Sequence, residues 1–281
     1  MLSYRHAFHA GNHADVLKHF VLIELLRYFN RKDKPWWYID THAGAGCYAL
    51  DSDQATKNAE FDAGIMRLWE RSDLPDALKP YIEAVGQFNP HGRLTFYPGS
   101  PALAMTQLRE QDRMRLFELH PADAETLEQT FARDTERVAI RRADGFAGLR
   151  SLLPPPTRRA VVLIDPPYEV KDDYRRVTEV VADAMRRFPG GTYAVWYPML
   201  ARPEARRLPE RLADLGAESW LDVRLAVCKP GRDGFGMFGS GLYIVNPPWV
   251  LPEILEKTMP WLVKALALDD EAGFDLEHHI E

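Results

Sequence analysis

The chain has 281 residues, and its 46% hydrophobic content is enough to bury a sizeable core in one large α/β domain or two small ones. No stretch approaches the run of about 20 apolar residues that a membrane-spanning helix requires, and the N-terminus lacks the apolar region of a secretory signal. Two cysteines are too few for a disulfide framework or a four-ligand zinc site, and we expect both to be reduced thiols. These features predict a globular cytoplasmic protein.

The formal net charge of -6 argues at first against a nucleic-acid partner. Residues 265–281, however, carry six acidic side chains and no Lys or Arg, so residues 1–264 are neutral overall. Within that neutral body, residues 1–34 hold six basic and three acidic side chains together with four histidines. The pattern predicts an acidic C-terminal tail over residues 265–281, and it makes contact with RNA possible through local basic patches.

The first element expected in chain order is a helix that starts at Asn12 or His13 and carries apolar residues on one side. Amphipathic sequence over about residues 50–93 then predicts a small helical insertion. Seven short runs rich in β-branched and aromatic residues predict strands, and helical spacing separates several of them. This alternation predicts a single α/β domain with a seven-stranded, mostly parallel, doubly wound sheet. The seven runs are residues 36–39, 115–117, 138–140, 160–164, 192–196, 223–227 and 242–245.

The most specific motif is Asp165-Pro166-Pro167-Tyr168, which follows the fourth run. Two consecutive prolines hold the chain in a rigid, extended turn at the strand's carboxyl end, where doubly wound sheets bind ligands. The Asp165 carboxylate and the Pro166 carbonyl can together accept both hydrogens of an exocyclic amino group, and Tyr168 offers a face on which a base can stack. The motif therefore indicates methylation of an amino-bearing base. A plain strand-ending turn is the alternative.

Three further features follow the first three runs. The loop after the first run contains Gly44 and Gly46, which let the backbone approach a nucleoside, and it lacks the full pattern of a dinucleotide site. This loop resembles the cofactor loop of class I methyltransferases, and Glu118 ends the second run, where such enzymes place a carboxylate on the ribose hydroxyls of the cofactor. Asp144 and Gly145 end the third, where a carboxylate and backbone amides can read an adenine amino group. Together with the motif at Asp165, these features follow the first four runs in order, and this order predicts an S-adenosylmethionine-dependent methyltransferase that needs no metal or covalent intermediate.

A competing motif, Asn246-Pro247-Pro248-Trp249, follows the seventh run. The catalytic motif of this class belongs on the fourth strand, beside the glycine loop of the first. We therefore assign catalysis to Asp165 and a structural or peripheral role to Asn246.

Four segments together resemble the bacterial 23S ribosomal RNA adenine-N6 methyltransferases of the J type. The resemblance spans essentially the whole chain except the acidic tail, and its N-terminal block is the most specific part. The segments are residues 1–19, the loop Asp40-Thr41-His42-Ala43-Gly44-Ala45-Gly46, the segment Tyr97-Pro98-Gly99-Ser100-Pro101, and Asp165-Pro166-Pro167-Tyr168.

The resemblance implies a Rossmann-like class I methyltransferase fold with a helical insertion, S-adenosyl-L-methionine as cofactor, and one adenine of 23S ribosomal RNA as substrate, either naked or in an early large-subunit particle. It implies that the first-helix region closes over the cofactor and that Tyr4, Arg5 and His6 contact RNA. A polar helix start with incidental histidines is the alternative for that region, and we expect no metal there. We expect a monomer. The implied cofactor pocket is lined by Lys18, His19, His42, Gly44, Gly46, Ser100, Glu118, Asp144, Gly145 and Asp165.

The sequence leaves two alternatives open, one for the substrate and one for the activity. The motif at Asp165 serves several amino-bearing bases, so DNA adenine or guanine N2 of RNA are competing substrates; the lack of a visible target-recognition domain favours RNA over DNA. A catalytically inactive RNA-binding module is the other alternative, and the intact Asp165 and Gly44-Ala45-Gly46 disfavour it.

Overall fold

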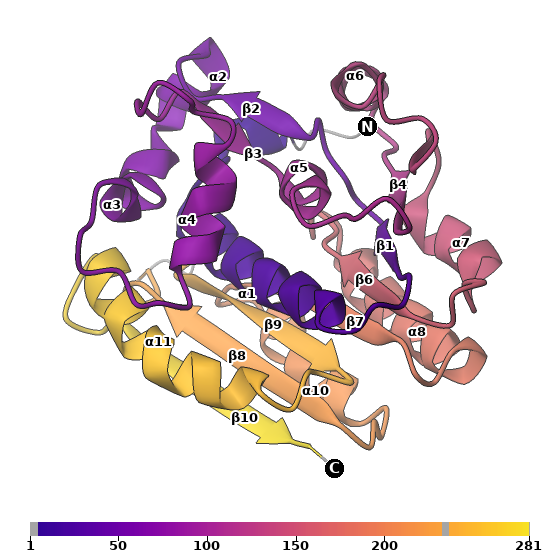
Figure 1. The fold of residues 1–281 in the computed structure, drawn as a ribbon. Coiled ribbons are helices and arrows are strands. Elements are labelled where there is room, and N and C mark those ends of the chain that lie inside the picture. Colours follow the sequence, from indigo (N-terminus) through magenta and orange to yellow (C-terminus); the bar gives the residue numbers. More distant parts are fainter. Residues whose placement is uncertain (1–4, 232–235, 281) are drawn as a thin grey trace.

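The computed structural model describes residues 5–231 and 236–280. Within them, an eight-stranded sheet forms the centre of the fold, in the order β10-β8-β9-β7-β6-β1-β4-β5 (Figure 1). Strands β5, β4, β1, β6 and β7 are parallel, β9 lies antiparallel to both β7 and β8, and β10 lies antiparallel to β8. The strands are β1 (Trp37–Asp40), β4 (Arg113–Phe117), β5 (Val138–Arg141), β6 (Ala160–Ile164), β7 (Thr192–Met199), β8 (Trp220–Ala226), β9 (Gly239–Val245) and β10 (Gly273–His279).

The sheet has eight strands rather than the seven predicted, because β10 lies inside the acidic segment over residues 265–281. Phe274 and Leu276 alternate with acidic side chains along β10 and pack against the core, while Asp275 and Glu277 remain exposed. An edge strand needs only this half-buried alternation. Its acidic composition concealed the pattern in the sequence.

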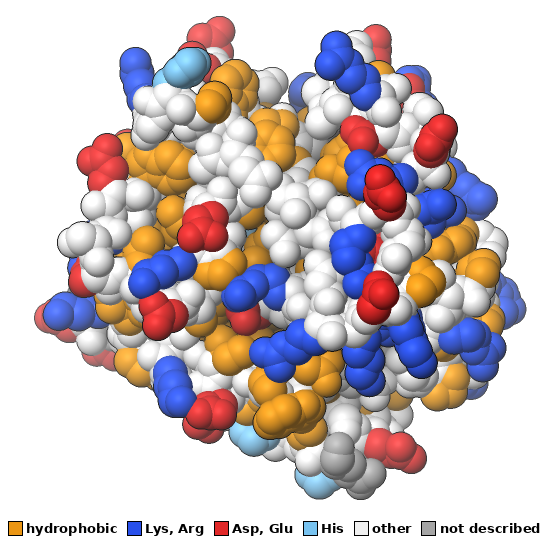
Figure 2. Space-filling view, in the orientation of Figure 1, with side chains coloured by type: hydrophobic (Ala, Val, Ile, Leu, Met, Phe, Trp, Pro, Cys, Tyr) orange, Lys and Arg blue, Asp and Glu red, His pale blue; other side chains and the backbone are white. Residues whose placement is uncertain are grey.

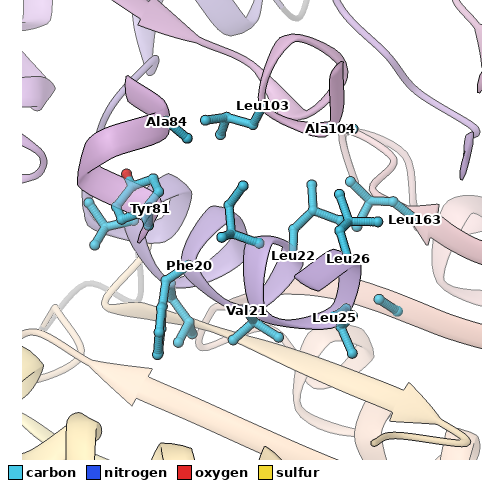
Figure 3. Packing of buried hydrophobic residues seen from close by; sticks show 14 of the residues in the cluster. Phe20, Val21, Leu22, Leu25, Leu26, Tyr81, Ala84, Leu103, Ala104 and Leu163 are labelled. Atoms are coloured by element: carbon cyan, nitrogen blue, oxygen red, sulfur yellow. The ribbon is translucent and has the colours of Figure 1, made fainter. Parts of the chain in front are cut away.

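Helix α1 (His13–Asn30) begins where the sequence predicts a helix start. The Asn12 side chain accepts hydrogen bonds from the backbone amides of Ala14 and Asp15, both at 3.0 Å, and so satisfies two of the free amides of the first turn. Nearly every side chain of the helix is buried, which differs from the one-sided pattern expected. The helix lies between the sheet and the short helices of the insertion (Figure 1). Figure 3 shows its apolar side chains Phe20, Val21, Leu22, Leu25 and Leu26 among neighbours from both sides, which include Tyr81, Ala84, Leu103, Ala104 and Leu163.

The chain between β1 and β4 contains a two-stranded sheet and several short helices. Strand β2 (Cys47–Ala49) pairs antiparallel with β3 (Phe96–Pro98), and four short helices connect them. This region contacts the N-terminal segment, where Ile65 N donates to the carbonyl of Gly11 at 2.8 Å. It then returns to the sheet through α5 (Ser100–Met105). The connecting helices are α2 (Asp53–Asn58), η2 (Glu60–Ala63), α3 (Met66–Trp69) and α4 (Lys79–Gly86).

The remaining helices complete two apolar layers, one on each face of the sheet. Residues of α1, α4, α5 and α11 contribute to one buried cluster, and residues of α7, α8 and α10 contribute to the other. None of the described helices has both the length and the apolar character needed to cross a membrane. The helices not yet given are η1 (His6–Phe8), α6 (Pro121–Thr130), α7 (Gly145–Leu149), η3 (Arg150–Leu152), α8 (Lys171–Arg187), α9 (Pro203–Arg206), α10 (Leu208–Ala213) and α11 (Leu251–Leu266).

Candidate active site

A cavity of about 320 Å³ lies at the carboxyl ends of β1, β4, β5 and β6. Parallel strands end at one edge of a sheet, so the four motifs that follow these strands meet there. The cavity brings together most of the residues that the sequence singles out. Those that line it are His6, Lys18, His19, His42, Gly44, Ser100, Glu118, Asp144, Gly145, Asp165 and Pro166.

Asp165 is held by an ion pair that the sequence does not reveal. Lys18 Nζ donates to Asp165 Oδ2 at 2.6 Å and lies 2.9 Å from Asp15 Oδ1, one turn earlier on α1. The ammonium group also lies 5.5 Å from the ring centroid of Trp196. Burial disfavours the charged form of Lys18, but the two carboxylates outweigh it and raise the pKa of the ammonium. The positive charge therefore fixes the position of the Asp165 carboxylate at the cavity wall.

The glycine loop takes its shape from backbone conformations that favour glycine. Gly44 has φ +62°, and a Cβ there would lie 2.3 Å from the Tyr48 hydroxyl. Its amide donates to Glu118 Oε2 at 2.8 Å, and His120 N donates to Oε1 of the same carboxylate at 2.6 Å. Burial raises the pKa of Glu118. Gly46, at φ +84°, does not line the cavity; its carbonyl accepts from Gly99 N at 2.8 Å and holds the loop against the next segment.

Asp144 caps the start of α7 with Oδ1, which accepts from the amides of Phe146 and Ala147. Its other oxygen, Oδ2, accepts a hydrogen bond from Arg176 of α8. Burial opposes the charged form, but the bond and charge of Arg176 outweigh it and hold the pKa of Asp144 below its usual value. At Gly145 a Cβ would lie 1.9 Å from the carbonyl oxygen of Thr41, so only glycine fits this close approach of α7 to the β1 loop.

Asp40, at the end of β1, is a fully buried residue that sequence reasoning missed. Oδ2 accepts hydrogen bonds from Ser100 Oγ and from the Tyr38 hydroxyl, each at 2.7 Å, and Oδ1 accepts from the amide of His42 at 3.1 Å. Burial raises the pKa of Asp40. Its place at the head of the glycine loop was the available signal. The His42 ring lies 4.8 Å from that of Phe146, and burial lowers the pKa of His42 to about 4, so the ring is neutral.

His19 lies in the buried face of α1 and also lines the cavity. Nδ1 lies 2.7 Å from the hydroxyl of Tyr97, which in turn lies 2.9 Å from the hydroxyl of Tyr81. Nε2 is buried and has no hydrogen-bond partner among residues 5–231 and 236–280. Burial lowers the pKa of His19 well below its usual value, so the ring is neutral.

Tyr168 does not lie where the stacking prediction requires it. It has φ +52°, its ring is only 2% exposed, and its hydroxyl donates to the carbonyl of Trp196 at 2.6 Å. The turn after the two prolines directs the ring into the core beside Tyr174, at a centroid distance of 4.7 Å. A buried ring offers no face to a base. Next to Asp165, the cavity wall is formed instead by Pro166 and Pro167.

The competing motif at Asn246 lies at the opposite edge of the sheet. Strand β9 is antiparallel to β7, so its last residue, Val245, pairs with Tyr193 near the start of β7. The Asn246 side chain donates to the carbonyls of Pro189 and Gly191, both at 2.7 Å, and stabilises that turn. The assignment of a structural role to Asn246 agrees with this geometry.

One described residue of the N-terminal segment reaches the cavity. His6 lines the cavity and lies 2.9 Å from Asp15 Oδ2, which connects it to the ion pairs of Lys18. Arg5 does not line the cavity, and its Nη2 atom lies 3.4 Å from Asp123 Oδ1. Tyr4 lies outside the described residues.

A second, open cleft between α7 and α8 adjoins the cavity and shares Phe146 and Arg176 with it. Asp183 accepts hydrogen bonds from Arg186 at 3.0 Å and Arg187 at 2.7 Å, and Arg150 lies 3.7 Å away. Three guanidinium groups thus share one carboxylate, which leaves a local excess of positive charge. Figure 2 shows many Lys and Arg side chains over the α7–α8 side of the molecule.

The strand order, the antiparallel β9 and a cavity at the ends of β1, β4, β5 and β6 define a class I methyltransferase fold. The chain belongs to the family described as ribosomal RNA large subunit methyltransferase D, RlmJ, whose model matches residues 33–278.

Two relatives carry the name ribosomal RNA large subunit methyltransferase J. The protein of Escherichia coli K12 is 47% identical over 93% of this chain and 93% of its own length. That of Haemophilus influenzae is 42% identical over 99% of this chain and 98% of its own length. The crystal structure of protein LPL1258 from Legionella pneumophila aligns with a TM-score of 0.89 at 34% identity, covering 96% of this chain and 98% of that one.

Proposed function

We propose that this protein transfers a methyl group from S-adenosyl-L-methionine to the N6 nitrogen of one adenine in 23S ribosomal RNA. The observation that carries the proposal is the shared cavity, in which the glycine loop at Gly44 and the acid-diproline corner at Asp165 face one space. The names of the relatives support ribosomal RNA as the substrate. We further propose that the chain acts as a monomer in the cytoplasm and needs no metal.

The residues present fit the cofactor. A cavity of about 320 Å³ lies in the range of small-molecule sites, roughly 300–1,000 Å³. The bare backbone at Gly44, where a side chain would collide with Tyr48, allows close approach of a nucleoside. Glu118 supplies a carboxylate for the ribose hydroxyls and Asp144 one for the adenine amino group. His19 Nε2 is buried without a hydrogen-bond partner in the part of the chain that the structure describes, and a ligand would satisfy this polar atom.

The proposed chemistry is mainly a matter of positioning. When bound, the sulfonium of the cofactor supplies an electrophilic methyl group. Lys18 occupies Oδ2 of Asp165, so Oδ1 is the oxygen left for one hydrogen of the target amino group. The Pro166 carbonyl would accept the other, which leaves the nitrogen lone pair directed at the methyl group. We assign proton loss to a step after transfer, because a neutral aromatic amine is too weak an acid to give its proton to a carboxylate, whereas the methylated cation gives it up readily, and Asp165 Oδ1 is the first acceptor. The base is held by the prolines and the rim of the cavity, since Tyr168 is buried.

We propose that RNA reaches the cavity across the N-terminal segment, through Tyr4, Arg5 and His6, and that the basic α7–α8 cleft holds flanking phosphates. The cleft adjoins the cavity and carries an excess of arginine, which is the charge that a nucleic-acid backbone requires. A base must leave its stack to enter a cavity of this kind.

The test is methylation in vitro of ribosomal RNA from cells that lack the enzyme, followed by mass mapping. The proposal predicts one N6-methyladenine in large-subunit RNA and a loss of at least about 100-fold in rate with Asp165→Asn, a substitution of matched size. A methylated guanine, or methylation of DNA adenine, would support another base as substrate. No methylation of any nucleic acid, with cofactor binding intact, would favour an inactive RNA-binding module. A parallel assay with naked and ribosome-particle RNA separates the two forms of substrate.

A further inference from the structure

His19 lies at the end of a buried chain of three hydrogen-bonding groups. The chain runs from Tyr81 of α4 to Tyr97 of β3 and then to Nδ1 of His19, with distances of 2.9 Å and 2.7 Å. All three side chains are at most 1% exposed. Burial raises the pKa of both tyrosines well above the usual value of 10, so both hydroxyl groups keep their hydrogens. The positions of these hydrogens determine which group donates and which accepts at each hydrogen bond of the series.

Only one direction gives every hydroxyl hydrogen an acceptor. If Tyr81 donates to Tyr97 and Tyr97 donates to Nδ1, both hydroxyl hydrogens are satisfied. If His19 donates from Nδ1 instead, one of the two hydroxyl hydrogens is buried without an acceptor among the described residues. A buried donor without an acceptor is costly. The ring is neutral and carries a single hydrogen, so the first direction places that hydrogen on Nε2.

Nε2 is the atom of His19 that has no partner among the described residues, and the residue lines the cavity. A buried N–H group at a ligand site is satisfied by a ligand acceptor. The charged acceptor of the proposed cofactor is the carboxylate of its methionine portion, and a bond to a charged acceptor is the stronger kind. The acids of the cavity, Glu118, Asp144 and Asp165, cannot donate to that carboxylate while they are ionised.

We propose that Tyr97, oriented by Tyr81 of the helical insertion, is a positioning residue that keeps the hydrogen of His19 on Nε2, where it binds the carboxylate of the cofactor. The inference rests on the proposed function, because it takes S-adenosylmethionine as the ligand. It gives the insertion between β2 and β3 a role in cofactor recognition. Tyr97 itself does not line the cavity and acts through His19.

The test compares two ligands that differ only in this carboxylate, S-adenosylmethionine and decarboxylated S-adenosylmethionine, by calorimetry without RNA. The ratio of their dissociation constants within one variant cancels any general loss of folded protein. Tyr97→Phe should reduce the preference for the carboxylate between about threefold and tenfold, the effect of losing one neutral hydrogen bond. Tyr81→Phe keeps the bond from Tyr97 to His19 and should reduce the preference less.

Tyr193→Phe is the matched control. Tyr193 is as buried as Tyr97, but its hydroxyl donates to the carbonyls of Ala184 and Phe188 near the opposite edge of the sheet, so the ratio should not change. Nitrogen-15 NMR of histidine-labelled wild-type protein, with His19→Gln used to assign the signal, should find the hydrogen of His19 on Nε2.

A hydrogen on Nδ1 of wild-type His19, an unchanged ratio in Tyr97→Phe, or a larger effect from Tyr81→Phe would each overturn the inference. Failure of the proposed cofactor is seen in a different way, since wild-type protein would then bind neither ligand, and failure of the proposed substrate is seen only in the methylation assay. If the protein binds S-adenosylmethionine and Tyr97→Phe leaves the ratio of dissociation constants unchanged, the role of Tyr97 is wrong and the proposed function is unaffected.

Discussion

Replacement of Gly44 by alanine tests whether the glycine loop is shaped for a ligand or only for folding. Gly44 has φ +62° and Gly216 has φ +70°, so alanine at either position carries a similar backbone penalty of about 1–2 kcal/mol. A Cβ at Gly216 meets nothing within 4 Å, whereas one at Gly44 would lie 2.3 Å from the Tyr48 hydroxyl. Gly216→Ala is therefore a control with the same backbone cost and no collision.

The collision at Gly44 displaces a side chain that supports the loop. The Tyr48 hydroxyl accepts a hydrogen bond from the amide of Ala45 at 3.1 Å, and its loss costs about 1 kcal/mol. We expect Gly44→Ala to be less stable than Gly216→Ala by about 1 kcal/mol in urea unfolding, or roughly 2 °C in melting temperature. Tyr48 also lines the cavity, so affinity for S-adenosylhomocysteine should fall about tenfold in Gly44→Ala alone. Equal stability of the two variants, with unchanged ligand affinity in both, would show that the contact between Gly44 and Tyr48 supports neither the fold nor a ligand site.

Lys18→Met leaves the carboxylates of Asp15 and Asp165 without their shared cation. We therefore expect it to lower the free energy of unfolding by about 3–5 kcal/mol and to abolish methylation. Urea unfolding at the wild-type midpoint would contradict this expectation. Burial lowers the pKa of His13 and of His42 to about 4 from 6.5, so the unfolded chain binds more protons between these values. Stability should therefore decrease as pH falls, by about 1.5 kcal/mol per histidine from pH 6.5 to 5, and a flat profile in urea unfolding would be inconsistent with neutral buried rings. The double variant Arg186→Gln/Arg187→Gln should weaken RNA binding and reduce the slope of log binding constant against log salt concentration by about 0.7–0.9 for each lost phosphate contact. Lys79→Gln on α4 should change neither quantity. Identical slopes in wild type and the double variant would show that the α7–α8 cleft does not contact RNA.

The sequence contained enough information to predict the place of the main site residues. Asp165, Gly44, Glu118 and Asp144 follow consecutive apolar runs, and parallel strands bring such positions to one edge. The same counting separated Asp165 from Asn246, because a motif on an antiparallel strand ends at the other edge. These predictions depend on chain order, which a sequence shows directly.

Contacts between distant segments could not be predicted in this way. The ion pair of Lys18 with Asp165 joins residues 147 positions apart, and only the i, i+3 spacing of Asp15 and Lys18 was visible beforehand. The burial of Tyr168 depends on a positive φ after two prolines, a conformation that a non-glycine residue seldom adopts. Strand β10 escaped detection because an exposed edge strand tolerates the acidic residues that also mark a solvated tail.

A crystal structure of the complex with S-adenosylhomocysteine would show directly whether the cavity holds the cofactor beside Asp165. We expect the adenine to lie beside Asp144, the ribose hydroxyls to contact Glu118, and the sulfur to face the corner formed by Asp165 and Pro166. A ligand bound outside this cavity, or one whose sulfur faces away from Asp165, would contradict this placement.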